Sequence, residues 1–246
     1  MIGHLGGVAQ LTGQTLRCLV RRPVELRALV RQIDLLGIGS TSVTLLTAIF
    51  TGMVMALQFS VGLEPYGASL YTGKLVSLGI VRELGPVLTA LLVGGRVGSG
   101  ITAEIGSMSV TEQVDAIRAL GADPVKRLVL PRVLACVISL PLLTMVADIV
   151  GVLGGMIITM QEVGITWRFF LNQLLDTIWA VDLLHGLGKS VFFGYIIGIV
   201  GCYMGMRTTG GTAGVGRNTT ATVVIVSISI LVSDYLLTNL FLAIYG

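Results

Sequence analysis

The stretch from Val43 to Gly62, VTLLTAIFTGMVMALQFSVG, decides the fold class, because it holds no charged residue. A helix that crosses the hydrocarbon core of a membrane needs about 20 mostly apolar residues, and this stretch supplies them. The whole 246-residue chain agrees, since 54% of its residues are hydrophobic and 12% are charged, whereas soluble domains average about 25% charged residues. A water-soluble monomer is therefore excluded, and the sequence predicts an all-α polytopic membrane protein.

Four further apolar stretches raise the number of predicted membrane spans to five. A single domain over 1–246 is expected to contain spans over 43–62, 75–95, 133–160, 183–206 and 219–245. The third and fifth spans exceed the minimum length, so we expect them to tilt, or the third to break at Pro141.

The basic residues predict the orientation of these spans. The segments 1–42, 96–132 and 207–217 hold 12 Lys and Arg residues, against 2 in 63–74 and 161–182. Cytoplasmic loops carry the excess of positive charge. We therefore expect the N-terminus in the cytoplasm and the C-terminus outside, on the opposite side of the membrane.

An amphipathic helix is predicted over 16–36, before the first span. Leu16, Leu19, Leu26 and Val30 recur along one face, while charged residues occupy another. Such a helix lies in the membrane interface. The alternative is a short soluble helix.

The segment between spans two and three carries clear helix-boundary signals. Ser109 and Glu112 fit a capping box at the start of a helix over 110–120, and Gly121 fits its C-terminal end. Asp123 and the proline after it fit the start of the next helix. A short, firmly capped helix outside the membrane suits docking to a soluble partner, although a plain connector is the alternative.

A set of ordered motifs over these residues resembles the MlaE/YrbE permease family, the membrane subunits of ABC-type lipid transporters that work with MCE-domain proteins. The resemblance covers nearly the whole chain. It rests on ELGP at 83–86, GRVGS at 95–99, TAEIGSM at 102–108, TEQ at 111–113, ALGADP at 119–124, PR at 131–132 and SLPLLT at 139–144.

The resemblance implies a subunit of a larger assembly in a bacterial inner membrane. The expected partners are a second copy of the chain, cytoplasmic ATPase subunits that hold ATP and Mg, a periplasmic MCE-domain ring, phospholipid and a small accessory subunit. The chain itself is expected to hold no cofactor. The region 103–123 would couple to the ATPase through Glu104, Met108, Glu112, Gln113, Asp115, Arg118 and Asp123.

Charged residues inside membrane spans are candidate sites, because each costs about 2.5–3.5 kcal/mol at a helix centre. We expect Asp148 and Lys189 to be structural partners of neighbouring helices. Arg82 and Glu83 are sequence neighbours, so they point about 100° apart and need not pair. The resemblance favours a functional role for these two and for Arg96 and Glu104, and Asp234 completes the set.

A lipid path should be apolar and adaptable, and methionine side chains suit acyl chains of variable shape. The alternative for each candidate residue is ordinary packing or contact with membrane lipid. The candidates are Met53, Met55, Leu57, Phe59, Tyr235, Leu236 and Leu240.

The remaining motifs do not predict a nucleotide-binding, catalytic or metal site on this chain. Gly211 and Gly216 have the spacing of a P-loop, but Arg217 and Asn218 replace its Lys-Ser/Thr pair, so we expect a flexible loop over 210–219 and an ATPase on another chain. Two histidines and three cysteines show no catalytic or metal-ligand spacing. A net charge of +3 is too small to indicate a nucleic-acid partner.

Four GxxxG motifs, beginning at residues 94, 151, 194 and 201, predict close helix contacts within one chain or between two. Two function classes compete with an ABC permease: an ion-coupled secondary transporter and a membrane scaffold that transports nothing. Five spans do not divide into two equal repeats, which weighs against the first of these rivals.

Overall fold

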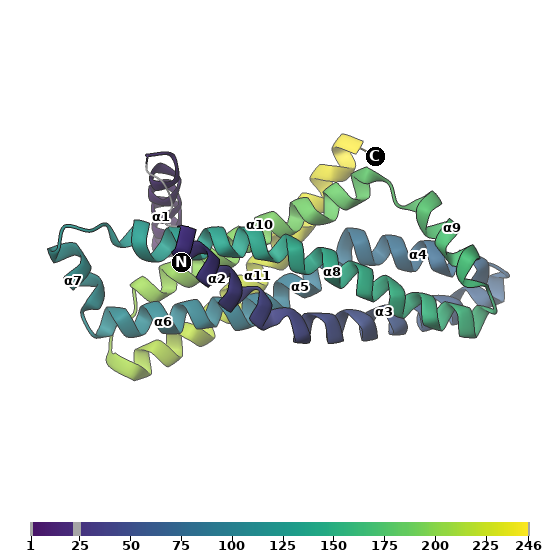
Figure 1. Ribbon diagram of the computed structural model, residues 1–246, viewed down its shortest axis with the longest axis horizontal. Helices are drawn as coiled ribbons and strands as arrows, with labels where there is room; N and C mark the ends of the chain where they lie inside the picture. The colour runs from purple at the N-terminus through teal and green to yellow at the C-terminus, as the bar shows by residue number, and fades with distance from the viewer. Residues whose placement is uncertain (1, 22–25, 246) are drawn as a thin grey trace. The chain divides into compact units, whose positions relative to one another are not determined.

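The computed structural model describes residues 2–21 and 26–245, and every regular element in these two ranges is helical (Figure 1). Five helical stretches are long and apolar enough to cross a membrane, which confirms the predicted all-α polytopic class. They are Leu26–Tyr66, Ser69–Val110, Val125–Val163, Ala180–Met206 and Gly211–Ile244.

The predicted helix over 16–36 corresponds to two helices. The first, α1 (Ile2–Arg21), begins well before the predicted start, and α2 (Leu26–Leu36) follows. Residues 22–25 lie outside the described residues. α2 has no buried side chain, which fits both a helix on a membrane surface and the alternative of a short soluble helix.

The second span is one helical stretch with two π-helical turns. After α3 (Thr41–Leu63) and two short 3₁₀ turns, η2 (Glu64–Tyr66) and η3 (Ser69–Tyr71), the stretch begins at residue 72. It runs to residue 110, well beyond the predicted end at 95. Its parts are α4 (Thr72–Gly79), the π turn η4 (Ile80–Leu84), α5 (Gly85–Val93), the π turn η5 (Gly94–Gly98) and α6 (Ser99–Val110).

The third span follows α7 (Gln113–Ala119) and the π turn η6 (Val125–Val129), and it does not break at Pro141. α8 (Leu130–Val163) continues through this residue as one helix. Membrane helices tolerate proline where neighbouring groups satisfy the freed backbone.

The remaining elements are α9 (Trp167–Thr177), α10 (Ala180–Met206) and α11 (Gly211–Tyr245). The predicted flexible loop over 210–219 is wrong, because α11 already begins at Gly211. Gly210 and Gly211 adopt φ angles of 85° and 67°, so the reversal occurs in two glycines that tolerate this conformation. α9 was not predicted; Thr166 caps it by accepting a hydrogen bond from the Phe169 amide at 3.4 Å.

The chain forms two compact units. Unit 1 comprises Met1–Ser40, Ala90–Leu140 and Val191–Tyr235, and unit 2 comprises Thr41–Thr89, Pro141–Ser190 and Leu236–Gly246.

Unit 1 is held together by small residues and buried hydroxyl groups. The Thr102 hydroxyl on α6 contacts the Gly201 carbonyl of α10 at 3.0 Å and the Thr222 hydroxyl of α11 at 2.9 Å. At Gly194, a Cβ atom would stand 2.5 Å from the Cys136 carbonyl oxygen. Glycine here lets α8 and α10 approach backbone to backbone, as the GxxxG pattern predicts.

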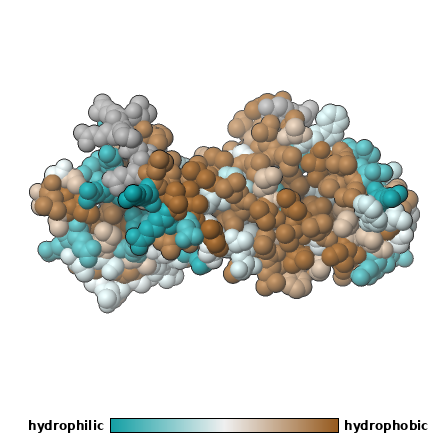
Figure 2. Space-filling model, in the orientation of Figure 1, coloured by the Kyte–Doolittle hydropathy of each residue, from teal (hydrophilic) through white to brown (hydrophobic). Residues whose placement is uncertain are grey.

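Unit 2 has a small apolar core between α3, α4, η4, α8 and α9. Its buried members are Ala56, Val76, Ile80, Val81, Val152 and Phe170. A Cβ atom on Gly52 of α3 would collide with the Gly151 carbonyl of α8. The outer faces of α3 and α8 are apolar instead of polar (Figure 2), which is the pattern of helices that face lipid.

Candidate functional site

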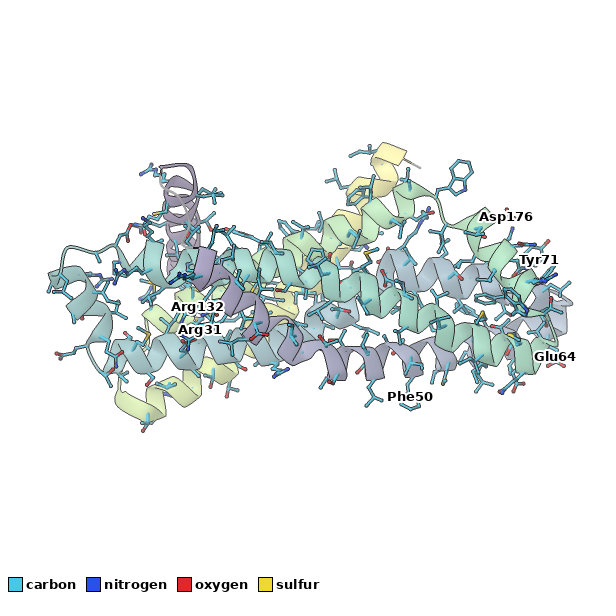
Figure 3. The ribbon with its side chains drawn as sticks, viewed as in Figure 1. Arg31, Phe50, Glu64, Tyr71, Arg132 and Asp176 are labelled. Carbon is cyan, nitrogen blue, oxygen red and sulfur yellow. The ribbon has the colours of Figure 1, made fainter. Side chains whose placement is uncertain are left out.

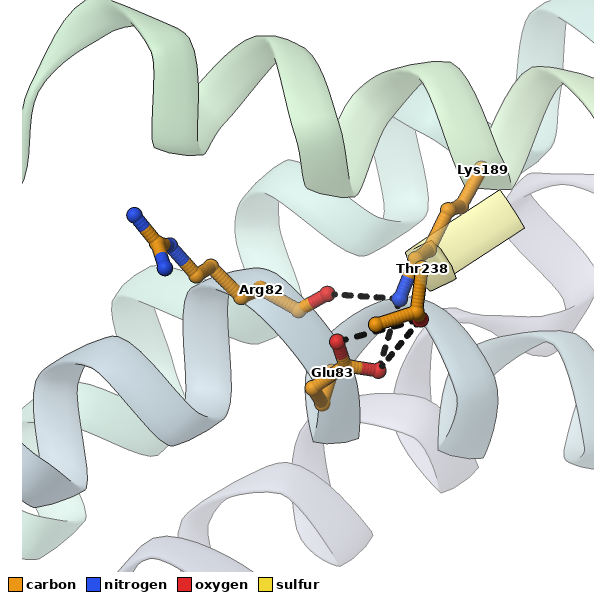
Figure 4. A network of polar contacts seen from close by, with 4 residues as sticks. All are labelled: Arg82, Glu83, Lys189 and Thr238. Atoms are coloured by element: carbon orange, nitrogen blue, oxygen red, sulfur yellow. Dashed lines mark hydrogen bonds and ion pairs between the residues drawn. The ribbon is translucent and has the colours of Figure 1, made fainter. Parts of the chain in front are cut away.

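The clearest polar feature is a cluster of five side chains in unit 2, which we call the polar cluster; Figure 4 shows four of them, without Asp182. The π turn η4 supplies two of its members, α10 two and α11 one. The members are Arg82, Glu83, Asp182, Lys189 and Thr238.

Lys189 is fully buried and contacts oxygen atoms of both Arg82 and Glu83. Its Nζ lies 2.6 Å from Glu83 Oε2 and donates to the Arg82 carbonyl at 3.2 Å (Figure 4). The Thr238 hydroxyl donates to Glu83 Oε1 at 3.3 Å. Lys189 is thus a structural partner, as expected, and its charge is neutralised inside the fold.

Arg82 forms a separate ion pair with Asp182. Asp182 is 2% exposed and also accepts a hydrogen bond from the Trp179 amide at 2.8 Å, where α10 begins. The two neighbouring residues Arg82 and Glu83 therefore point to different partners on α10, as their helical spacing predicted.

Asp148 lies on α8 in unit 2, and its expected structural partner is absent from the described residues. The side chain is buried against Gly85, and its Oδ1 has no hydrogen-bond partner there. It lines a cavity of about 260 Å³ whose other walls are apolar residues of η4, α8, α9 and α10. Asp234 is half-buried on α11.

In unit 1 the predicted capping box is wrong. Ser109 lies in the last turn of α6 and donates its hydroxyl to the Thr208 carbonyl at 3.3 Å. Its backbone is already helical, so it cannot cap a new helix. Glu112 instead has a left-handed φ of 59°, without a side-chain cap, and α7 starts after it at Gln113.

The predicted end of α7 is correct. Gly121 has a φ of 74°; its amide donates to Arg118 and the next amide donates to Ile117, which is a Schellman motif. The Asp123 carboxylate accepts from the Val125 amide at 2.9 Å and so caps the following helix. α7 is therefore fixed between two defined turns and lies across the direction of α6 (Figure 1).

Most side chains of α7 and its flanks are exposed. Glu112, Gln113 and Asp115 are exposed, while Val114 alone among the residues of α7 is buried. Asp115 and Arg118 form an exposed ion pair at 2.8 Å.

Other members of the predicted coupling set lie on α6. Glu104 is exposed and pairs at 2.7 Å with Arg132, a buried arginine that the sequence analysis did not single out. Arg132 also donates to the Leu128 carbonyl at 2.7 Å. Met108 is half-buried. Arg96 is exposed, and its guanidinium lies 3.4 Å from the Ser40 hydroxyl.

The predicted lipid-path residues differ in exposure. Met55 and Phe59 pack against the core of unit 2, Met53 is half-buried, and Leu57 is exposed. On α11, Tyr235, Leu236 and Leu240 are exposed.

The structure shows instead an exposed apolar stripe along α3. Its residues recur at intervals of three or four, and Phe50 among them projects away from the ribbon (Figure 3). We call this the α3 stripe. It consists of Val43, Leu46, Phe50, Val54, Leu57 and Val61.

Within the described residues there is no group of three or more His, Cys, Asp or Glu side chains that could hold a metal ion. Fold and site together define a multi-pass helical membrane protein with paired charges inside its spans and an exposed, fixed helix between the second and third of them. The chain belongs to the MlaE permease family, whose model, Permease MlaE, matches residues 29–240.

Two of the similar proteins are named as probable ABC transporter permeases. A probable ABC transporter permease protein of Rickettsia felis is 40% identical over 223 residues, which is 91% of this chain and 86% of the relative. A probable ABC transporter permease protein of Synechocystis is 42% identical over 227 residues, 92% of this chain and 86% of the relative. The Arabidopsis thaliana protein trigalactosyldiacylglycerol 1, chloroplastic, is 35% identical over 231 residues, 94% of this chain and 66% of the relative.

Proposed function

We propose that this chain is the permease subunit of an ABC-type lipid transporter. It moves phospholipid between a bacterial inner membrane and a periplasmic MCE-domain partner, driven by a separate ATPase that holds ATP and Mg. Its membership of the MlaE permease family supports the permease role. The Arabidopsis relative's name contains that of a glycerolipid, which supports a lipid substrate. The N-terminus is cytoplasmic and the C-terminus periplasmic in this proposal.

The observation that carries the proposal is the geometry of α7. This helix has one buried side chain, Val114, and is fixed by defined turns at both ends. Its polar side chains therefore remain available while its direction is set by the fold. An exposed and rigid helix can transmit a push from an ATPase into α6, which continues directly into the second span.

The lipid side of the proposal rests on the α3 stripe. Six apolar side chains along one face of a span are left exposed by the part of the chain that the structure describes. We propose that a second copy of the chain faces this surface and that phospholipid acyl chains occupy the space between the copies. A small accessory subunit is a further expected component.

The polar cluster has a supporting role in this proposal. Its two ion pairs tie η4 to α10 with the charges neutralised in place. An apolar path for acyl chains requires that charged side chains in the membrane be neutralised by ion pairs, because an unpaired charge in the membrane is costly.

The deciding experiment is purification of the tagged full-length chain from its native membrane in mild detergent. Co-purification of an ATPase and an MCE-domain protein, with phospholipid retained, is the expected result. A lone oligomer that shows proton-driven uptake after reconstitution would instead identify a secondary transporter. A lone oligomer without flux would identify a scaffold.

A further inference from the structure

Unit 1 contains a cavity of about 620 Å³ beside the helix that is proposed to meet the ATPase. It lies where α1 packs against η6, beside the end of α7. Its walls come from four separate parts of the chain: Gln14, Arg17, Cys18, Arg118, Asp123, Pro124, Val125, Lys126 and Met206.

The charged walls of this cavity favour an anion. The cavity is lined by three cations, Arg17, Arg118 and Lys126, and by one carboxylate, Asp123. That carboxylate is already engaged, since one oxygen accepts from the Val125 amide at 2.9 Å and the other lies 3.5 Å from the Cys18 thiol. Arg118 is paired with Asp115. The structure gives neither Arg17 nor Lys126 an ion pair with a described residue, so two cations are available to a ligand.

The surroundings favour a lipid over a soluble anion. Leu16 and Leu19 are 55% and 42% exposed and lie on the face of α1 opposite the one that Gln14, Arg17 and Cys18 turn to the cavity. A helix with an exposed apolar face opposite a basic face is typical of helices that lie at the level of the headgroups. The same segments carry the excess of Lys and Arg that marks the cytoplasmic side, where anionic lipids attract basic residues.

We propose that this cavity binds the phosphate of an anionic phospholipid headgroup from the adjacent leaflet, through Arg17 and Lys126. This site is separate from the transport path. Because Arg118 of α7 lines the same cavity, a bound headgroup lies within reach of the helix proposed to meet the ATPase. The permease would thereby sense anionic lipid on that side of the membrane.

The test measures lipid binding by the full-length chain in detergent micelles, with native mass spectrometry used to count bound lipids. Phosphatidylglycerol and phosphatidylcholine of identical acyl chains are titrated separately. The cavity variant carries Arg17→Gln and Lys126→Gln. The matched control carries Arg27→Gln and Arg31→Gln, which remove the same charge from exposed positions of α2.

The wild-type chain should prefer phosphatidylglycerol, and the cavity variant should lose this preference while the control keeps it. Each cation near an anionic lipid strengthens binding about fivefold, so the cavity variant should bind about 25-fold more weakly. Equal losses in both variants would overturn the proposal, because they would show general attraction between charges. Equal binding of both lipids by the wild type would also overturn it.

A competition arm separates the lipid from free phosphate. Inorganic phosphate at millimolar concentration should not displace phosphatidylglycerol, since the acyl chains of the lipid also hold it in the micelle around the protein. Displacement would overturn the lipid assignment. No ATPase or MCE partner is present in this assay, so its outcome does not depend on the proposed transport function.

Discussion

Removing either member of the Glu83–Lys189 pair should destabilise the chain, and the two costs should differ. Lys189 is 0% exposed, whereas the Glu83 side chain is 38% exposed. Glu83→Gln leaves a fully buried ammonium group without its counter-charge, which costs about 3–5 kcal/mol. Lys189→Met leaves a carboxylate that is accessible from outside the chain and keeps its hydrogen bond from Thr238, so the cost should be about 1–3 kcal/mol.

The double variant sharpens this prediction. With both charges gone, the double variant should cost less than the sum of the single variants, by about 2 kcal/mol, because contacting residues are coupled. The assay is equilibrium unfolding of the full-length chain in detergent micelles, followed for the wild type, both single variants and the double variant.

An exposed pair provides the control. Asp115→Asn and Arg118→Gln neutralise the ion pair on α7, and each should change stability by less than about 1 kcal/mol. The reasoning is refuted if Glu83→Gln costs no more than Lys189→Met. It is also refuted if the costs of the two substitutions add to within about 0.5 kcal/mol, which is the behaviour of independent sites.

Three further predictions concern α7 and the packing of the spans. Glu112→Lys combined with Asp115→Lys should uncouple ATP hydrolysis from lipid transfer while membrane insertion stays intact; normal ATPase binding and transfer would contradict the coupling role. Gly52→Ala should lower the free energy of unfolding by at least about 1–3 kcal/mol, because its Cβ meets a facing carbonyl. Gly62→Ala, with open space around it, should leave that free energy unchanged or raise it by up to about 1 kcal/mol. Equal unfolding midpoints for the two variants would contradict this prediction. Thr102→Val removes hydroxyl contacts to two other helices and should cost about 1–3 kcal/mol, measured by unfolding in micelles, and an unchanged stability would show that those contacts are not needed.

The features that sequence analysis predicted correctly are local ones. The uncharged stretch from Val43 to Gly62 identifies a span by its composition alone. Gly121 and Asp123 mark the ends of adjacent helices because each acts on amides within a few residues of itself. Such signals depend only on residues within about one helical turn, so they can be recognised without knowledge of tertiary contacts.

The features that it missed or misplaced depend on distant residues. Asp182 pairs with Arg82, which lies 100 residues away in the sequence. No local sequence pattern predicts such a partner. Ser109 belongs to a capping-box pattern that fits a helix start, but in the structure Ser109 still lies inside α6, which ends at Val110. α9 is too short for a span, and only its cap, Thr166, and its amphipathic spacing could have revealed it.

The α3 stripe was missed for a related reason. A span without charges offers no polar face from which to orient the helix. Met55 and Phe59 therefore could not be distinguished by sequence from Phe50 and Leu57, although the first two pack inward and the others are exposed. The candidates for lipid contact are better chosen by exposure than by residue type.

The two π turns of the second span, η4 and η5, alter how this stretch accommodates changes in length. Each π turn holds one residue more than the same turn of α-helix, and one residue is about 100° of helical rotation. A one-residue deletion inside η4 or η5 can therefore be absorbed if the turn reverts to α geometry. The same deletion in the uninterrupted α8 would turn every later side chain of that span away from its partners. Differences in length among related chains are thus best sought at residues 80–84 and 94–98.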